Sequence, residues 1–190
     1  MDRNEFVKYY WKHYKFLEKQ FLDTERYVAI EKDNYAVYSN EFLNLFVLIC
    51  NEYDAITAEY CNSIKESARP LNMVDKNELL CESINGFKDL SISTKFKYDS
   101  IKILPFSKYK KDMTYDWWQA YNLVKHKRSN IDSDTKKPNY YKANLKNVLT
   151  ALSALYIFLN KFYIEKCSCS LGTVNPDFVL NSDVFNDFQQ

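Results

Sequence analysis

Chain breakers are scarce in this sequence, and that scarcity constrains its fold more than any other feature. The chain has 2 Gly and 4 Pro among its 190 residues. A turn-rich all-β sandwich needs such residues at its tight turns, so that architecture is disfavoured. Gly86 and Gly172 also stand outside any phosphate-cradling pattern, which argues against P-loop and Rossmann folds. The sequence therefore favours long helices with few interruptions.

Apolar residues recur at spacings of three and four along most of the chain, which is the periodicity of amphipathic helices. This pattern predicts helices over about residues 4–28, 40–68, 75–86, 117–129 and 140–166. The last of these is strongly apolar from Leu145 to Tyr163, so we expect it to be the central core helix. A polar linker over 132–138 is expected to precede it.

The region 94–104 breaks the helical pattern, because its apolar and polar residues alternate with a period of two. This alternation predicts a small β-hairpin or an extended insertion. The expected fold class is therefore all-α, an antiparallel bundle of four to five main helices with this one insertion. We expect a single bundle domain over 1–166, followed by a loosely packed C-terminal tail over 167–190.

Charge and cysteine usage exclude several classes of function. The net charge of +1 gives no global attraction to nucleic acid, so any such contact must come from a local basic patch. The five cysteines include no Cys-x-x-Cys pair and the two histidines lie far apart, so we expect no metal site and no cofactor. Reduced thiols favour a cytoplasmic protein.

A membrane location is also not expected from the sequence. The most apolar run, 148–159, is shorter than the ~20 residues that a membrane-spanning helix needs. The charged N-terminus does not resemble a signal peptide.

Candidate functional residues are concentrated in the stretch 115–129. Asn122 and His126 are four positions apart and share one face of the expected helix. A neutral imidazole can act as a general base near pH 7, and Lys125, Lys127 and Arg128 could hold a phosphate. A base beside phosphate-binding cations is the chemistry that metal-free RNA cleavage requires.

Structural explanations exist for the same residues. His126 with Asn122 could make a polar contact between helices, and cations near a helix C-terminus complement its dipole. Trp117 and Trp118 are expected to be packing anchors rather than base-stacking residues.

The stretch Trp-Trp-Gln-Ala-Tyr-Asn-Leu-Val-Lys-His-Lys-Arg, residues 117–128, resembles the motif helix of HEPN-domain proteins. These proteins are helical bundles of bacterial toxin–antitoxin, abortive-infection and CRISPR-associated systems. Active members are metal-independent endoribonucleases in which two motif helices meet across a homodimer. The resemblance implies RNA as substrate, a homodimer, and an antitoxin or regulatory protein as a further partner.

The resemblance also implies roles for individual residues. His126 would be the general base or acid and Asn122 its polar neighbour, with Lys125, Lys127, Arg128 and Tyr121 contacting RNA. The family places an arginine where this chain has Tyr121, so Lys125 or Arg128 would have to replace that cation. The alternative is a non-catalytic interaction or regulatory module in which His126 is a structural polar contact.

Overall fold

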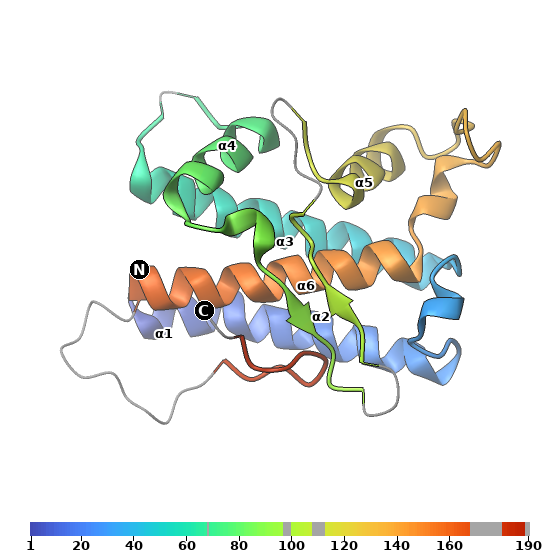
Figure 1. Ribbon diagram of the computed structural model, residues 1–190, viewed down its shortest axis with the longest axis horizontal. Coiled ribbons are helices and arrows are strands. Elements are labelled where there is room, and N and C mark those ends of the chain that lie inside the picture. The colour runs from blue at the N-terminus through green and yellow to red at the C-terminus, as the bar shows by residue number, and fades with distance from the viewer. Residues whose placement is uncertain (68, 97–99, 108–112, 168–179, 189–190) are drawn as a thin grey trace.

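The computed structural model describes residues 1–67, 69–96, 100–107, 113–167 and 180–188 (Figure 1). The helices are α1 (Arg3–Phe6), α2 (Lys12–Asp23), α3 (Asn40–Ile64), α4 (Met73–Ser83), α5 (Asp116–His126) and α6 (Leu145–Phe162). The strands are β1 (Ile92–Ser93) and β2 (Lys102–Ile103). The structure is 62% helical, which confirms the expected all-α bundle with a small β insertion.

Helix α6 is the centre of the core, as predicted from its apolar sequence. It lies between α3 and α2 (Figure 1), and nearly all of its side chains are buried. Aromatic rings fill the interface with α3, where Tyr53 and Tyr60 both meet Phe158 edge-on. Each fully buried side chain of this size contributes roughly 1.5–3 kcal/mol to folding.

The relative directions of the long helices differ in part from the predicted antiparallel arrangement. The N-terminal helical run from α1 to α2 is antiparallel to α6, since Phe6 of α1 stacks on Phe162 and Tyr14 of α2 stacks on Tyr156. Helices α3 and α6 instead run parallel. The residues just before them, Tyr38 and Asn144, are paired at one end of the bundle.

One helical run among the described residues, Leu145–Cys167, has the length and hydropathy of a membrane span. It is longer than the apolar run seen in the sequence because a π-helical turn, Tyr163–Cys167, continues α6. However, 72% of its most apolar window is buried inside the protein, as in a core helix. Its length and composition are therefore weak evidence for a membrane span.

Two helix boundaries differ from the predicted ones, one at the start of a helix and one at the end of another. Asn72, rather than Asp75, caps α4, and its Oδ1 accepts hydrogen bonds from the Val74 and Asp75 backbone N–H groups. Helix α3 ends at Ile64, several residues before Pro70, because Lys65 is extended.

The predicted hairpin is present but begins earlier than expected. Strands β1 and β2 pair antiparallel, with Ile92 opposite Ile103 and Ser93 opposite Lys102. The Thr94 hydroxyl accepts a hydrogen bond from the Ile101 N–H at 2.9 Å, which extends the pairing by one position. Residues 97–99 of the predicted hairpin lie outside the described residues.

The described part of the C-terminal segment, 180–188, is packed into the core and is not the loose tail that its polar composition suggested. Val184 and Phe185 are fully buried. The segment also lies along the hairpin, where Lys95 N–H donates to Val184 O at 2.8 Å and Asn186 N–H donates to Ser93 O at 2.9 Å. The preceding residues of the expected tail, 168–179, lie outside the described residues.

A buried carboxylate attaches this segment to α2. Glu18 is fully buried, and its Oε1 accepts hydrogen bonds from the Tyr14 hydroxyl at 2.8 Å, the Asp183 N–H at 3.0 Å and the Ser182 hydroxyl. Lys15 pairs with the other carboxylate oxygen. Burial, together with the charge of Glu18, raises the pKa of Tyr14 well above its usual range, so this hydroxyl remains a donor. With the Val184 N–H, which donates to Oε1 at 3.3 Å, five groups thus satisfy a charge that would otherwise be costly to bury.

Candidate functional site

Helix α5 carries four of the predicted site residues, Tyr121, Asn122, Lys125 and His126, and packs on α3 through its aromatic face. Trp117 and Trp118 are 3% and 6% exposed and both contact the ring of Tyr53. The Trp117 indole N–H donates to the Pro105 carbonyl at 2.9 Å. Both tryptophans are therefore packing anchors, as expected from the sequence. Their burial fixes which face of α5 is left to solvent.

Tyr121 belongs to this interface and not to an accessible surface. It is 2% exposed, and its hydroxyl donates to Asn51 Oδ1 of α3 at 2.6 Å. The Lys125 ammonium donates to the same hydroxyl at 3.0 Å. A direct contact between Tyr121 and RNA, as the sequence suggested, does not fit this burial. Asn51 is a contributor that the sequence did not reveal.

The chain of hydrogen bonds from Lys125 through Tyr121 to Asn51 also settles two protonation states. Burial raises the pKa of the Tyr121 hydroxyl, although the bond from Lys125 lowers it. The hydrogen bond to Tyr121 raises the pKa of the Lys125 ammonium. Tyr121 is therefore neutral and Lys125 positively charged at physiological pH. The result is a cation held beside the exposed face of α5.

Asn122 and His126 lie together on that exposed face, one helical turn apart. Both residues are exposed, and neither side chain makes a hydrogen bond or an ion pair within the described part of the chain. His126 is the last residue of α5. The arrangement leaves both polar groups available to a ligand, and it offers no contact between helices that would account for His126.

Lys127 and Arg128 follow the end of α5, with both residues exposed. The Arg128 guanidinium Nε donates to the Val124 carbonyl at 3.4 Å, which holds this cation at the C-terminal end of the helix, where it complements the helix dipole. Their backbone carbonyls accept hydrogen bonds from the Asn139 side chain at 2.9 Å and the Tyr140 N–H at 3.0 Å. The end of α5 is thereby tied to residues 139–142, which form a 3₁₀ turn before α6.

The predicted polar linker before α6 is an ordered turn. Asp132 Oδ1 accepts hydrogen bonds from the Asp134 and Thr135 N–H groups, and its other oxygen pairs with Lys142 at 2.8 Å. These contacts, chiefly the one with Lys142, hold the pKa of Asp132 well below its usual range. Lys136 closes the turn in the left-handed conformation, with φ of 57°.

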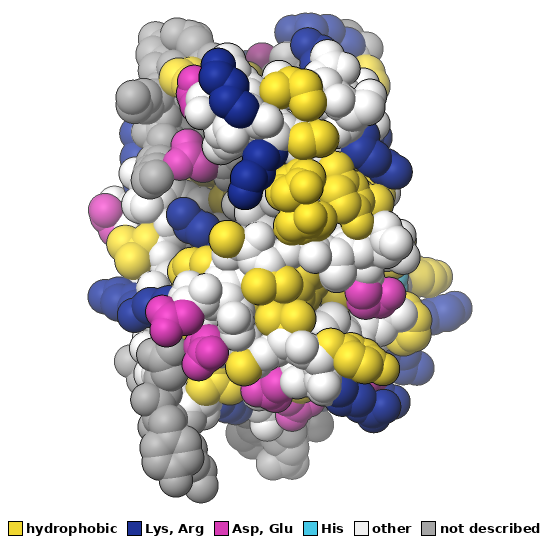
Figure 2. All heavy atoms as spheres, turned by 90° about the vertical axis from the view of Figure 1, so that its right-hand side faces the viewer, with side chains coloured by type: hydrophobic (Ala, Val, Ile, Leu, Met, Phe, Trp, Pro, Cys, Tyr) yellow, Lys and Arg dark blue, Asp and Glu magenta, His cyan; other side chains and the backbone are white. Residues whose placement is uncertain are grey.

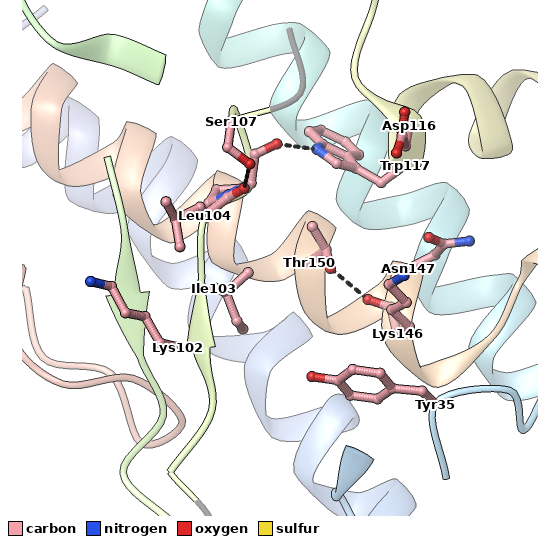
Figure 3. A pocket seen from close by; sticks show the side chains of 11 residues that line it. Tyr35, Lys102, Ile103, Leu104, Ser107, Asp116, Trp117, Lys146, Asn147 and Thr150 are labelled. Carbon is pink, nitrogen blue, oxygen red and sulfur yellow. Dashed lines mark hydrogen bonds between the residues drawn. The ribbon is translucent and has the colours of Figure 1, made fainter. Parts of the chain in front are cut away.

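A cavity of about 260 Å³ lies at the other end of α5 (Figure 3). The hairpin, the start of α5 and one side of α6 form its walls, with Lys102, Lys146 and Tyr35 around it. In this view the Trp117 indole points to the carbonyl at the Pro105 turn, and Thr150 bonds back to Lys146. Neither Asn122 nor His126 lines this cavity, so it is separate from the candidate site on the exposed face of α5.

The described residues contain no group of three or more His, Cys, Asp or Glu side chains that could hold a metal ion.

The predicted site consists of Asn122, His126 and Lys125 on one surface, with Lys127 and Arg128 at its edge and Tyr121 beneath it. Comparison with family models, with curated proteins and with solved structures finds no match, so any function must be inferred from these residues and their geometry.

Proposed function

We propose that this protein acts on RNA through the exposed face of α5, as a metal-independent endoribonuclease of HEPN type. The observation that carries the proposal is the exposure of Asn122 and His126 together, with a charged Lys125 beside them. Buried polar side chains are normally hydrogen-bonded within the fold. Asn122 and His126 are instead exposed and have no partner in the described part of the chain, so both can bond a ligand.

The chemistry assigned to His126 is transfer of a proton. As a neutral imidazole it would take the proton of a ribose 2′-hydroxyl, whose oxygen then attacks the adjacent phosphorus. The bond from phosphorus to the 5′-oxygen breaks, and that oxygen takes up a proton. A cyclic phosphate and a free 5′-hydroxyl are the products. Lys125 would stabilise the charge that develops on the phosphoryl oxygens, and Asn122 would orient the phosphate or the imidazole.

Lys125 is the proposed replacement for the family's arginine. Tyr121 occupies the arginine position but is buried, and its hydroxyl holds the Lys125 ammonium at 3.0 Å. An ammonium group binds phosphate as a point charge, whereas a guanidinium can form two parallel hydrogen bonds to it. Lys125 should therefore position the phosphate less firmly than an arginine would. This difference predicts a slow enzyme.

A single α5 face is open to solvent, where charged groups stabilise a transition state poorly. Two such faces brought together in a homodimer would enclose the RNA between them and supply two imidazoles, one for each proton transfer. The proposed active form is therefore a dimer in which each chain contributes Asn122 and His126.

The direct test is incubation of the purified protein with single-stranded RNA in EDTA, with analysis of the product ends. His126→Ala should reduce cleavage by roughly 10²- to 10⁴-fold. His13→Ala is the matched control, because His13 is the other histidine and pairs with Glu52 on a different surface. It should change cleavage by less than about twofold. Equal cleavage by wild type and His126→Ala would reject the assignment of His126.

Subunit mixing tests the shared site. If both copies must supply His126, a ninefold excess of His126→Ala protein should reduce total cleavage by the wild type to about a tenth. Independent sites would leave cleavage unchanged.

The non-catalytic alternative makes a different prediction in these assays. RNA binding with no cleavage by the wild-type protein would favour an RNA-binding or regulatory module built on the same α5 face.

A further inference from the structure

Three tyrosines form a cluster at the end of the bundle where α5 stops and α6 begins. The ring centroids of Tyr38 and Tyr141 are 4.0 Å apart. Tyr140 meets the Tyr38 ring edge-on at 5.5 Å and the Tyr141 ring at 6.4 Å. These three residues are referred to as the tyrosine cluster.

The fold holds the tyrosine cluster rigidly. Tyr38 lies two residues before the start of α3 and pairs with Asn144, the residue before α6. The Leu145 N–H donates to the Val37 carbonyl at 2.9 Å, which joins the two helix starts. The Tyr140 hydroxyl donates to Asn40 Oδ1 at 2.8 Å. Rings anchored in this way lose little conformational entropy when a ligand binds to them.

The rings are nevertheless incompletely covered. Tyr38 is 37% exposed, and Tyr140 and Tyr141 are half-buried. Figure 2 looks onto this end of the molecule, where hydrophobic side chains form a band with Lys and Arg side chains beside its upper part. By contrast, several tyrosines around α6 are fully inaccessible. The exposed ring surface is available to a ligand.

The segment that carries Tyr140 and Tyr141 is basic although the whole chain is nearly neutral. The segment 127–146 has six Lys or Arg and two Asp, a net charge of +4, in a chain of net charge +1. The Lys137 ammonium lies 5.4 Å from the centre of the Tyr141 ring. One of the two acids, Asp132, is neutralised by Lys142. A ligand at this surface is therefore expected to be anionic.

The cluster is also continuous with the end of α5. The Tyr140 N–H donates to the carbonyl of Arg128 at 3.0 Å, and Arg128 lies two residues beyond His126. A chain-like ligand lying across the cluster would thus reach the exposed end of the α5 face.

We propose that the tyrosine cluster is a stacking platform for unpaired bases, with Lys137 and the neighbouring cations binding the phosphates of the same strand. This inference rests on the proposed function and narrows its substrate class to single-stranded RNA. Aromatic rings can stack only on bases that are not already stacked in a duplex, and flat rings beside cations are the usual means of binding single strands. The platform would hold the strand while the α5 face acts on it.

The test is a binding titration at low salt with a fluorescent single-stranded oligouridylate and with an RNA duplex of equal length, using the His126→Ala protein to prevent cleavage. Tyr141→Leu should weaken single-strand binding about tenfold, the typical loss for one stacked base. Tyr141→Phe retains the ring and should bind like the parent. Tyr27→Leu is the matched control, since Tyr27 is 88% exposed and outside the cluster, and it should change binding by less than about twofold.

An abasic strand separates stacking from attraction to phosphate. It should bind the parent protein about tenfold more weakly than oligouridylate, and Tyr141→Leu should have no further effect on it. Lys137→Ala should weaken both strands and reduce the dependence of binding on salt. Equal loss of both strands in Tyr141→Leu, or duplex binding as tight as single-strand binding, would overturn the platform. So would a change of oligomeric state in Tyr141→Leu, which would show that a second copy covers the cluster.

Failure of the platform and failure of the proposed function have different signatures. Cleavage that depends on His126, together with binding that is unchanged in Tyr141→Leu and Tyr141→Phe, would reject the platform alone. An absence of any RNA binding by the parent protein at low salt would reject both. Circular dichroism of each variant excludes loss of the fold as the cause.

Discussion

Two polar clusters in this molecule are built in opposite ways. The Glu18 cluster is buried, and its carboxylate has partners in a tyrosine hydroxyl, a serine hydroxyl, a lysine and a backbone N–H group. The α5 face is exposed, and the described part of the chain gives Asn122 and His126 no hydrogen-bonding partner. The polar groups of the first cluster are hydrogen-bonded to one another within the fold, whereas those of the second are free to bond a ligand.

The physical difference is the cost of leaving a polar group without a partner. A buried charge that loses its partners has no water to replace them, so each bond of Glu18 is needed for stability. Asn122 and His126 are hydrated and bear no such penalty. Substitutions in the Glu18 cluster should therefore reduce stability, whereas substitutions of Asn122 and His126 should reduce function and leave stability unchanged.

The largest expected effect is at Glu18. Glu18→Ala removes the acceptor of the Ser182 hydroxyl and the Asp183 N–H and should reduce the free energy of unfolding by roughly 3 kcal/mol, measured by urea denaturation. Glu25→Ala, at an exposed acid just after α2, should change it by less than about 0.5 kcal/mol. A similar small change for both variants would mean that the buried cluster is not needed for stability.

A smaller loss of stability is expected at Tyr121, which is buried like Glu18 but lies directly beneath the exposed α5 face. Tyr121→Phe keeps the packing against Trp118 but removes the hydroxyl that bonds Asn51 and Lys125, which should cost about 1–2 kcal/mol of unfolding free energy. Tyr9→Phe, at a tyrosine that is 55% exposed, is the control and should be neutral. Tyr121→Phe should also reduce any RNA cleavage, because the Tyr121 hydroxyl would no longer hold Lys125 in place. A fall in stability without a fall in cleavage would separate Tyr121 from the site.

Much of the fold follows from local sequence patterns. The apolar run of α6 predicted a core helix, and the spacing of Asn122 and His126 predicted that they share a face, since both depend only on helical periodicity. Burial of Trp117 and Trp118 was likewise predictable from their size and apolar character. The exposed side of α5 is then the side that these rings do not occupy.

The remaining features depend on contacts between distant residues, which local patterns cannot reveal. Asn51 and Tyr121 are 70 positions apart, and Glu18 and Ser182 are 164 apart. The polar composition of 180–188 suggested a loose tail because nothing nearby shows that a buried carboxylate receives it. The tyrosine cluster also escaped prediction, since Tyr38 meets Tyr141 only when α3 and α6 begin side by side.

Asp132 lies partly buried at the surface, where its charge is bonded by neighbouring groups, and loss of those bonds should affect stability less than the change at Tyr121. Its pKa is lowered by Lys142 and Thr135, so the bonded carboxylate stabilises the turn above about pH 4, the ordinary pKa of aspartate, and that stabilisation is lost as pH falls through the lowered value. The amide signal of Thr135 in NMR spectra should therefore stay unchanged down to about pH 4 and shift only in stronger acid. In Asp132→Asn, which cannot form the ion pair, the same signal should show no such titration. A shift centred near pH 4 in the wild type would indicate that the pair does not form in solution.

The smallest effect on stability is expected where the largest effect on function is proposed. His126→Ala and Asn122→Ala remove exposed side chains that bond nothing in the described structure, so each should change the unfolding free energy by less than about 0.5 kcal/mol. Parallel urea denaturation and RNA cleavage assays on the same protein samples would measure both properties. Unchanged stability with lost cleavage is the signature of residues kept for a ligand. A loss of stability above about 1 kcal/mol in His126→Ala would instead show that the histidine serves the fold, as the interaction-module alternative requires, and the contrast with Glu18 would disappear.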